Sequence, residues 1–209
     1  MSSYTNKTIQ CKCCGFNYKT KILRGFFNSV VADLDTYAHS SVIFDRVVKC
    51  PNCGYSTEQM NAEVDEEVIA IVYSEDYQAI VKDVTLSDVY KKNYLCAFLH
   101  EFKHEYKEAA LHYLRAYWIT REEDNICQDL LVKVVDNMKC YLTSNMDISS
   151  ALIMIDCMRQ MSCFDEAEET AKSLNCYLRN DYDKKLILFE LDLIKNRDNK
   201  PHSQSEVVS

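Results

Sequence analysis

The chain has 209 residues, 47% of them apolar, and a formal net charge of −8. Only three Gly and two Pro leave few turn residues for a sandwich or barrel of many short strands, so the composition excludes those folds and favours helix. No apolar run approaches the roughly 20 residues that cross a bilayer, and no export signal is visible, so we expect a cytoplasmic protein with no membrane association. Eleven cysteines in that compartment indicate metal ligands and buried thiols rather than disulfides.

Residues 1–60 have a short, strand-like apolar pattern. We predict strands over 8–11, 17–23 and 42–50, where apolar residues alternate with polar ones or β-branched residues cluster. This segment holds seven Lys/Arg against four Asp/Glu, a net charge of +3. Residues 61–209 hold 17 basic residues against 28 acidic ones, a net charge of −11.

Two motifs in the first segment share the pattern C-x-x-C-G-aromatic. They occupy residues 11–16 and 50–55, with 35 residues between the two cysteine pairs. Thiolates three positions apart on a tight turn can both reach one ion at about 2.3 Å, and the following glycine accepts a positive φ. Two such pairs complete a tetrahedron and leave no position for water. We therefore predict one structural Zn²⁺ ion, bound by Cys11, Cys14, Cys50 and Cys53.

Two alternatives to this ligand set remain open. Cys13 can replace Cys11 or Cys14, although alignment of the two motifs on their glycines places it opposite Asn52, which is not a ligand position. The pairs can also be redox C-x-x-C motifs, but such a pair usually opens a helix in a βαβ unit, which this segment lacks. The other six cysteines share no short spacing and are interpreted as small buried apolar residues, at positions 96, 127, 140, 157, 163 and 176.

After residue 60, apolar residues recur at helical spacing. Helices are predicted over 64–83, 87–103, 106–121, 124–142, 147–162, 164–179 and 181–196. Ser87, Asp124, Asp147 and Asp181 are the expected N-caps. Residues 197–209 are polar and contain a proline, so we expect a disordered tail. The predicted domains are thus a zinc ribbon (1–60), a helical domain (61–196) and the tail (197–209).

A third motif, His100-Glu101-Phe102-Lys103-His104, matches the H-E-x-x-H pattern of zinc metalloproteases. That chemistry needs both imidazoles on one face of an unbroken helix. Residues 104–116, however, resemble the turn and second helix of a tetratricopeptide unit, and His104 then occupies the glycine turn. We therefore expect no catalytic role for these residues and no enzymatic activity.

The same helical pattern recurs around Phe164. Ala109 and Ala167 occupy equivalent positions, 58 residues apart, whereas tandem tetratricopeptide repeats have a period of 34 residues. Small residues at these positions let paired helices approach closely. The fold class is therefore predicted to be mainly α: a small N-terminal β zinc ribbon followed by an irregular, tetratricopeptide-like array of helical hairpins.

The order of these features resembles a family of uncharacterised bacterial proteins, a domain of unknown function. Its members begin with C-P-x-C-G, continue through a basic K-T-K strand to C-P-x-C-G-Y, and end in tetratricopeptide-like helices. Here the matching residues are 11–15, 19–21 and 50–55, followed by 94–124. Lys12 stands where the family usually has proline. The resemblance implies zinc and a helical scaffold, with no established activity.

Three classes of function follow from the sequence. The first is a non-catalytic interaction or scaffold module whose helical domain binds an unidentified protein partner, because helical arrays present extended surfaces. The second is a nucleic-acid-associated regulator that uses the ribbon. Bound zinc would reduce the charge of the ribbon to about +1, so nucleic acid is not an expected partner. The third is a zinc hydrolase built on His100, Glu101 and His104. The identity of the partner, the biological process and the oligomeric state are not encoded in any motif.

Overall fold

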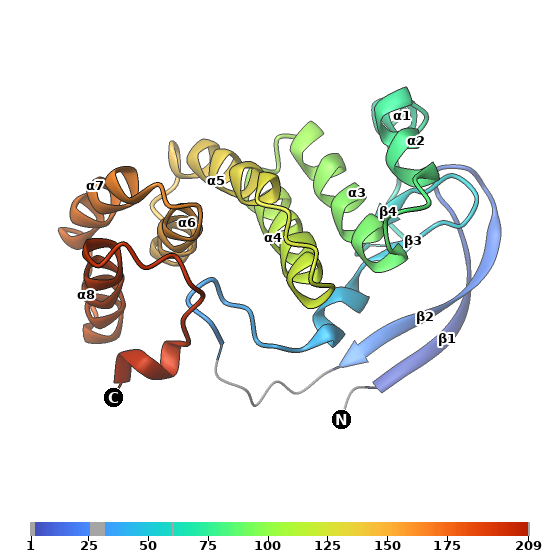
Figure 1. Ribbon diagram of the computed structural model, residues 1–209. Helices are drawn as coiled ribbons and strands as arrows, with labels where there is room; N and C mark the ends of the chain where they lie inside the picture. The colour runs from blue at the N-terminus through green and yellow to red at the C-terminus, as the bar shows by residue number, and fades with distance from the viewer. Residues whose placement is uncertain (1–2, 26–31, 60, 209) are drawn as a thin grey trace. The chain divides into compact units, whose positions relative to one another are not determined.

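A computed structural model describes residues 3–25, 32–59 and 61–208 of the chain. These residues form eight α-helices preceded by two small antiparallel hairpins, which confirms the predicted fold class (Figure 1). The chain divides into two compact units: residues 1–28 with 40–126, and residues 29–39 with 127–209. No helix in the described ranges has the length and apolar character to cross a membrane.

The first unit begins with two antiparallel hairpins. Strands β1 (Ser3–Gln10) and β2 (Asn17–Gly25) pair from Gln10 opposite Asn17 outward. Lys19 and Lys21 are exposed, and their neighbours in the strand are partly buried, as the predicted alternation requires: Tyr18, Thr20 and Ile22. Strands β3 (Val48–Lys49) and β4 (Ser56–Thr57) form the second, shorter hairpin.

The predicted strand over 42–50 is wrong along most of its length. A 3₁₀ helix, η1 (Ser41–Arg46), occupies its first half, and only Val48 and Lys49 pair with another strand. The 3₁₀ helix and the residue after it bury Phe44 and Val47, which are 3% and 2% exposed. The β propensity of Val and Ile is therefore overridden by the burial of these two side chains.

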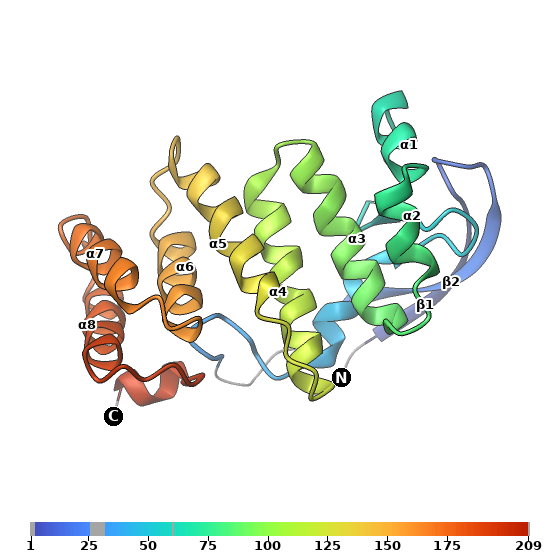
Figure 2. The same ribbon diagram turned by 45° about the horizontal axis from the view of Figure 1, so that its top comes forward.

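Four helices complete the first unit: α1 (Glu66–Val72), α2 (Glu75–Lys82), α3 (Asp88–Phe102) and α4 (Tyr106–Glu122). The single helix predicted over 64–83 is two helices. The side chain of Ser74 accepts a hydrogen bond from the backbone N–H of Tyr77 at 3.4 Å and starts α2 as an N-cap. Helices α3 and α4 lie side by side as a hairpin (Figure 2).

The second unit contains α5 (Asp129–Leu142), α6 (Ile148–Gln160), α7 (Phe164–Asn175), α8 (Asp181–Lys195) and a terminal 3₁₀ helix, η2 (Gln204–Val208). Neighbouring helices along the chain pack on one another here as well. Asp147 caps α6 as predicted, whereas the cap of α8 is Asn180, one residue before the predicted Asp181. Helix α5 begins five residues after its predicted cap, Asp124, which adopts a positive φ of 51° at the end of α4.

The α3–α4 and α6–α7 hairpins have the same type of tight turn between their helices. His104 and Ser162, 58 residues apart in the sequence, both adopt a left-handed conformation, with φ of 58° and 63°. In each turn the residue that follows donates its backbone N–H to a carbonyl five residues back, from Glu105 to His100 and from Cys163 to Met158, both at 2.9 Å. Ala109 and Ala167 are completely buried after these turns. The ends of α4 and α8 have the same form, with positive φ at Asp124 and Arg197, so the feature particular to the two hairpins is the buried alanine after each turn.

The C-terminal segment differs from the expectation of a disordered tail. Arg159 is completely buried in α6 and donates hydrogen bonds to the carbonyls of Asp198 at 2.7 Å and Lys200 at 2.8 Å. Residues 32–39 pair with the same segment, through the Leu34 N–H and the His202 carbonyl at 2.8 Å. These long-range contacts order residues that their composition alone would leave free.

Candidate metal centre

The two predicted zinc knuckles have the same backbone conformation. In each, the glycine N–H donates to the carbonyl of the first cysteine, and the N–H of that cysteine donates to the carbonyl of the aromatic residue. The distances are 2.8 Å (Gly15 to Cys11) and 2.9 Å (Cys11 to Phe16) in the first knuckle, and 3.0 Å (Gly54 to Cys50) and 2.8 Å (Cys50 to Tyr55) in the second. Both glycines have the predicted positive φ, 73° for Gly15 and 81° for Gly54.

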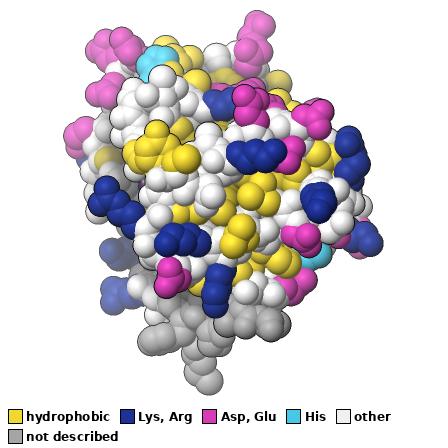
Figure 3. All heavy atoms as spheres, turned by 90° about the vertical axis from the view of Figure 1, so that its left-hand side faces the viewer, with side chains coloured by type: hydrophobic (Ala, Val, Ile, Leu, Met, Phe, Trp, Pro, Cys, Tyr) yellow, Lys and Arg dark blue, Asp and Glu magenta, His cyan; other side chains and the backbone are white. Residues whose placement is uncertain are grey.

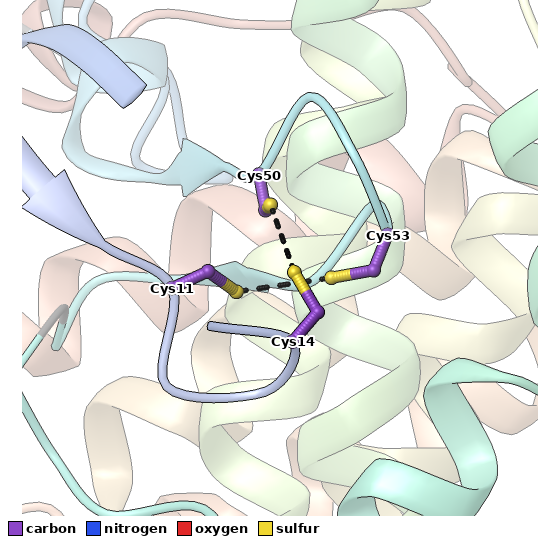
Figure 4. A group of neighbouring side chains, drawn as sticks. All are labelled: Cys11, Cys14, Cys50 and Cys53. Atoms are coloured by element: carbon purple, nitrogen blue, oxygen red, sulfur yellow. Dashed lines mark hydrogen bonds between the residues drawn. The ribbon is translucent and has the colours of Figure 1, made fainter. Parts of the chain in front are cut away.

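The hairpins bring the four predicted cysteines into one cluster (Figure 4). The Sγ atoms of Cys11, Cys14, Cys50 and Cys53 all lie within 4.8 Å of one another. Two of these separations run between the knuckles: 3.8 Å from Cys11 Sγ to Cys53 Sγ, and 3.7 Å from Cys14 Sγ to Cys50 Sγ. Three of the four side chains are buried and Cys14 is partly exposed.

These sulfur separations suit one tetrahedral metal ion. With zinc–sulfur bonds of about 2.3 Å, the edge of a regular tetrahedron of sulfurs is about 3.8 Å. A disulfide would need about 2.05 Å between sulfurs, so none joins these cysteines. Four sulfur ligands around one point leave no open coordination position, which is the arrangement of structural rather than catalytic zinc.

Cys13 lies outside this four-sulfur group, although it is buried, 8% exposed. Its contact is with one of the ligand candidates: a hydrogen bond between the Cys53 thiol and the Cys13 side chain, together with burial, raises the pKa of Cys53. The structure thus places Cys13 beside the cluster, where it packs against the sulfurs. The x position of the second knuckle, Asn52, also contacts the cluster, because its Nδ2 atom donates to Cys14 Sγ at 3.5 Å.

The electrostatics of the cluster favour a bound cation. Burial raises the pKa of both Cys11 and Cys50. Burial also opposes ionisation of Cys14, but hydrogen bonds from Asn52 and from the Phe16 backbone N–H lower its pKa to about 7. Four thiolates this close together would repel one another, whereas a divalent ion at their centre would stabilise all four.

The second knuckle is fixed to α2 by its backbone. Tyr77 Oη donates to the Gly54 carbonyl at 3.0 Å, and Gln78 Nε2 donates to the Cys53 carbonyl at 2.9 Å. A Cβ atom on Gly54 would lie only 2.3 Å from Cγ2 of Val81, so this position needs glycine for space as well as for φ. Sequence reasoning found the cysteines but missed these contacts, which connect residues far apart in the chain.

The cysteines also belong to the hydrophobic core of the first unit. Cys11, Cys13, Cys50 and Cys53 pack in one cluster with buried side chains of α1, α2 and α3: Val68, Val72, Tyr77, Leu95 and Leu99. The ribbon therefore has no separate core. Loss of the metal would affect the packing of the first three helices as well as the two hairpins.

The H-E-x-x-H residues do not form the arrangement of a metalloprotease. Helix α3 ends at Phe102, and His104 lies in the following turn, where its Nδ1 atom is 2.9 Å from Tyr106 Oη. Glu101 accepts a hydrogen bond from Tyr113 Oη at 2.6 Å. His100 turns toward α4, where its ring stacks on that of His112 with centroids 5.2 Å apart. The two imidazoles of the motif thus have different surroundings.

Of the six cysteines outside the ribbon, two are buried as interpreted from the sequence, Cys96 and Cys157. Cys127 is partly exposed. The interpretation is wrong for Cys140, Cys163 and Cys176, which are exposed.

The basic side chains of the β2 strand, Lys19 and Lys21, line a shallow depression together with Lys49 and Lys92. Two of these four lysines form ion pairs: Lys49 with Asp88 at 2.6 Å, and Lys92 with Asp45 at 2.9 Å.

Comparisons with known proteins return no relative: no family model, no curated protein and no solved structure matches the chain. The feature of the chain that points most directly to a function is the four-cysteine cluster, which the N-terminal hairpins carry and the helices follow.

Proposed function

We propose that Cys11, Cys14, Cys50 and Cys53 bind one structural zinc ion, and that the chain is a non-catalytic protein-interaction or scaffold module. The observation that supports zinc most strongly is the pair of sulfur separations, 3.8 and 3.7 Å, which match the edge of a zinc–sulfur tetrahedron. Thiolate ligands alone favour zinc over the hard cations calcium and magnesium, which take oxygen ligands.

The ion would have a mechanical role. The β1–β2 and β3–β4 hairpins form two separate two-stranded sheets, and each hairpin supplies two of the four sulfurs. Zinc would connect the two hairpins and hold both against α1–α3, since the cysteines lie in the same core. Binding worth about 10–16 kcal/mol in small zinc sites is ample for a ribbon with so little apolar area of its own.

Membership of the bacterial family with paired knuckles is part of the proposal. Its support is the order of features: two knuckles separated by a basic strand, then helical hairpins with a buried alanine after each turn, Ala109 and Ala167. The proposed location is the cytoplasm, where thiols stay reduced and available to a metal. The identity of the hairpins as tetratricopeptide-like units has the same support.

The proposed partner surface is on the helices rather than on the ribbon. In the second unit, exposed apolar side chains stand among charged ones, as the face over α7 and α8 shows (Figure 3). Leu188 on α8 is 61% exposed and Tyr182 is 44% exposed. Acidic and basic side chains are both present on this face, which suits a mixed polar and apolar protein contact better than a phosphate backbone.

The zinc proposal is tested by metal content and proteolysis. The full chain should contain zinc that Cys50→Ser removes, whereas Cys140→Ser, a change at an exposed cysteine on α5, should leave the metal content unchanged. Cys50→Ser should also make residues 3–82 protease-sensitive, because α1 and α2 share the cysteine core. Full zinc content in Cys50→Ser, or equal loss in both variants, would refute the site.

The partner proposal is tested with the full chain, because residues 61–209 alone would lack parts of both units. We expect a partner captured from the native organism and cross-linked to α8 to be lost with Leu188→Asp and kept with Val84→Asp, a change at a 94% exposed position in the first unit. Mixed DNA and RNA should not bind at physiological salt. Steeply salt-dependent binding that requires Lys19 and Lys21 would favour the nucleic-acid alternative instead.

A further inference from the structure

A second set of metal-ligating side chains converges in the first unit, apart from the four-cysteine cluster. Cys96 and His100 lie four residues apart on α3 and therefore share one face of the helix. His112, on α4, lies opposite them. One ligand atom from each of the three residues lies within 4.8 Å of the other two.

The three side chains lie close enough together to share one ion. Cys96 Sγ is 3.5 Å from His112 Nε2, and the two imidazole rings stack almost in parallel, 5.2 Å apart at an angle of 7°. Cys96 and His112 are buried, with 1% and 3% exposure, and His100 is partly exposed. The hairpin turn at 103–105 fixes α3 against α4 and so fixes the separation of the ligands.

Neighbouring carboxylates complete the environment. Glu105 Oε2 lies 2.5 Å from His100 Nδ1, which leaves Nε2 of His100 available, and a carboxylate in this position orients histidine ligands in metal sites. Glu58 Oε1 lies 3.8 Å from His112 Nε2 and 2.7 Å from Arg115 Nη1. The negative charges of the two carboxylates and of a Cys96 thiolate would together balance the positive charges of a divalent ion and the Arg115 guanidinium.

Arg115 shows what binding would change. Its Nη1 atom lies 3.1 Å from His112 Nδ1 and 3.5 Å from His112 Nε2, and a guanidinium can only donate. An ion bound through Nε2 would displace the contact at that nitrogen. The Cys96 proton would leave to solvent, and Arg115 would keep its bond to Glu58 at 2.7 Å.

A small cavity of about 70 Å³ adjoins the group. Its lining includes Cys96, Leu99 and His100 of α3, together with residues 55–57 at the end of the second knuckle. This volume can hold about two water molecules. A three-ligand site beside such a cavity retains a fourth position for water, unlike the closed four-cysteine cluster.

We propose that Cys96, His100 and His112 bind a second zinc ion, with a water molecule from this cavity in the fourth position. Nitrogen and sulfur ligands in this combination are typical of zinc. The alternative is a metal-free core in which the Cys96 thiol and the His112 ring form a hydrogen bond. The two arrangements differ in metal content, so they can be separated without any assay of activity.

The test counts zinc in the full chain after incubation with excess zinc and removal of the unbound metal. We expect two zinc ions per chain, one in His100→Gln, and two in His104→Gln, which changes the exposed histidine of the turn. Unchanged circular dichroism in His100→Gln would show that the loss is local. A count of one in the unsubstituted chain, or of two in His100→Gln, would overturn the proposal.

A second variant separates this site from the four-cysteine cluster. Cobalt substitution should give thiolate-to-metal charge transfer from five cysteines in the unsubstituted chain, so Cys96→Ser should lower this absorbance by about one fifth. Cys50→Ser should abolish most of it while the second ion remains. If Cys50→Ser removes a zinc ion but neither Cys96→Ser nor His100→Gln does, the structural site stands and the second site is refuted.

Discussion

The contact between Gly54 of the second knuckle and Val81 of α2 predicts how much an alanine at Gly54 would destabilise the first unit. Gly54 and Gly15 occupy equivalent positions with φ of 81° and 73°, but an added Cβ would meet Val81 Cγ2 at 2.3 Å in the first case and no atom within 4 Å in the second. Alanine at either position costs about 1–2 kcal/mol for the left-handed backbone. At Gly54 the steric overlap adds about 1–3 kcal/mol. Gly54→Ala should therefore destabilise the first unit by about 2–5 kcal/mol.

Urea unfolding of the zinc-loaded chain measures the difference. Trp118, the one tryptophan, lies buried in α4, so its fluorescence reports on the first unit. With a slope of about 1–3 kcal/mol per molar urea, the midpoint of Gly54→Ala should lie about 1 M below that of Gly15→Ala. Val81→Ala should relieve the overlap, so Gly54→Ala should cost less in that background. Equal midpoints for the two alanine variants would refute the packing of α2 on the knuckle.

Two further predictions concern Cys13 and the buried charges of the second unit. Cys13→Ser should retain the zinc of the four-cysteine cluster, and loss of that zinc, measured per chain, would make Cys13 a ligand. Arg159→Met should destabilise the second unit by about 3–5 kcal/mol, because Asp156 and Glu190 lose their shared cation, whereas the exposed Arg179→Met should change stability little. Burial and Asp156 raise the pKa of Glu190, so the folded state favours its protonated form and the loss should shrink as pH falls from 8 to 5. Thermal unfolding by circular dichroism would contradict this if the loss were independent of pH.

The sequence was most informative where the signal is local. The knuckles were predictable because Cys, Gly and an aromatic residue at fixed spacing define one turn, and the hairpin turn at His104 was predictable from the small residues that follow it. The break at 73–74 was not predictable, because apolar residues recur at helical spacing on both sides of Ser74. Only the hydrogen bond from the Tyr77 N–H to the Ser74 side chain shows that a new helix begins there.

Features that depend on distant residues were not predictable. The order of residues 197–208 depends on Arg159, whose hydrogen bonds span about 40 positions, and residues 32–39 join the second unit through the same segment. The i, i+4 pair of Cys96 and His100 is visible in the sequence. Its third member, His112, joins it only because the turn folds α4 back on α3.

The central claim is that four sulfurs surround one zinc ion, and the most direct measurement is X-ray absorption at the zinc edge. His100→Gln is the chain to use, because it should lack the second ion and so show the ribbon site alone. The account predicts a single shell of four sulfurs at about 2.3 Å, with no nitrogen or oxygen. A mixed shell of sulfur and nitrogen, or a folded chain with no zinc, would contradict it.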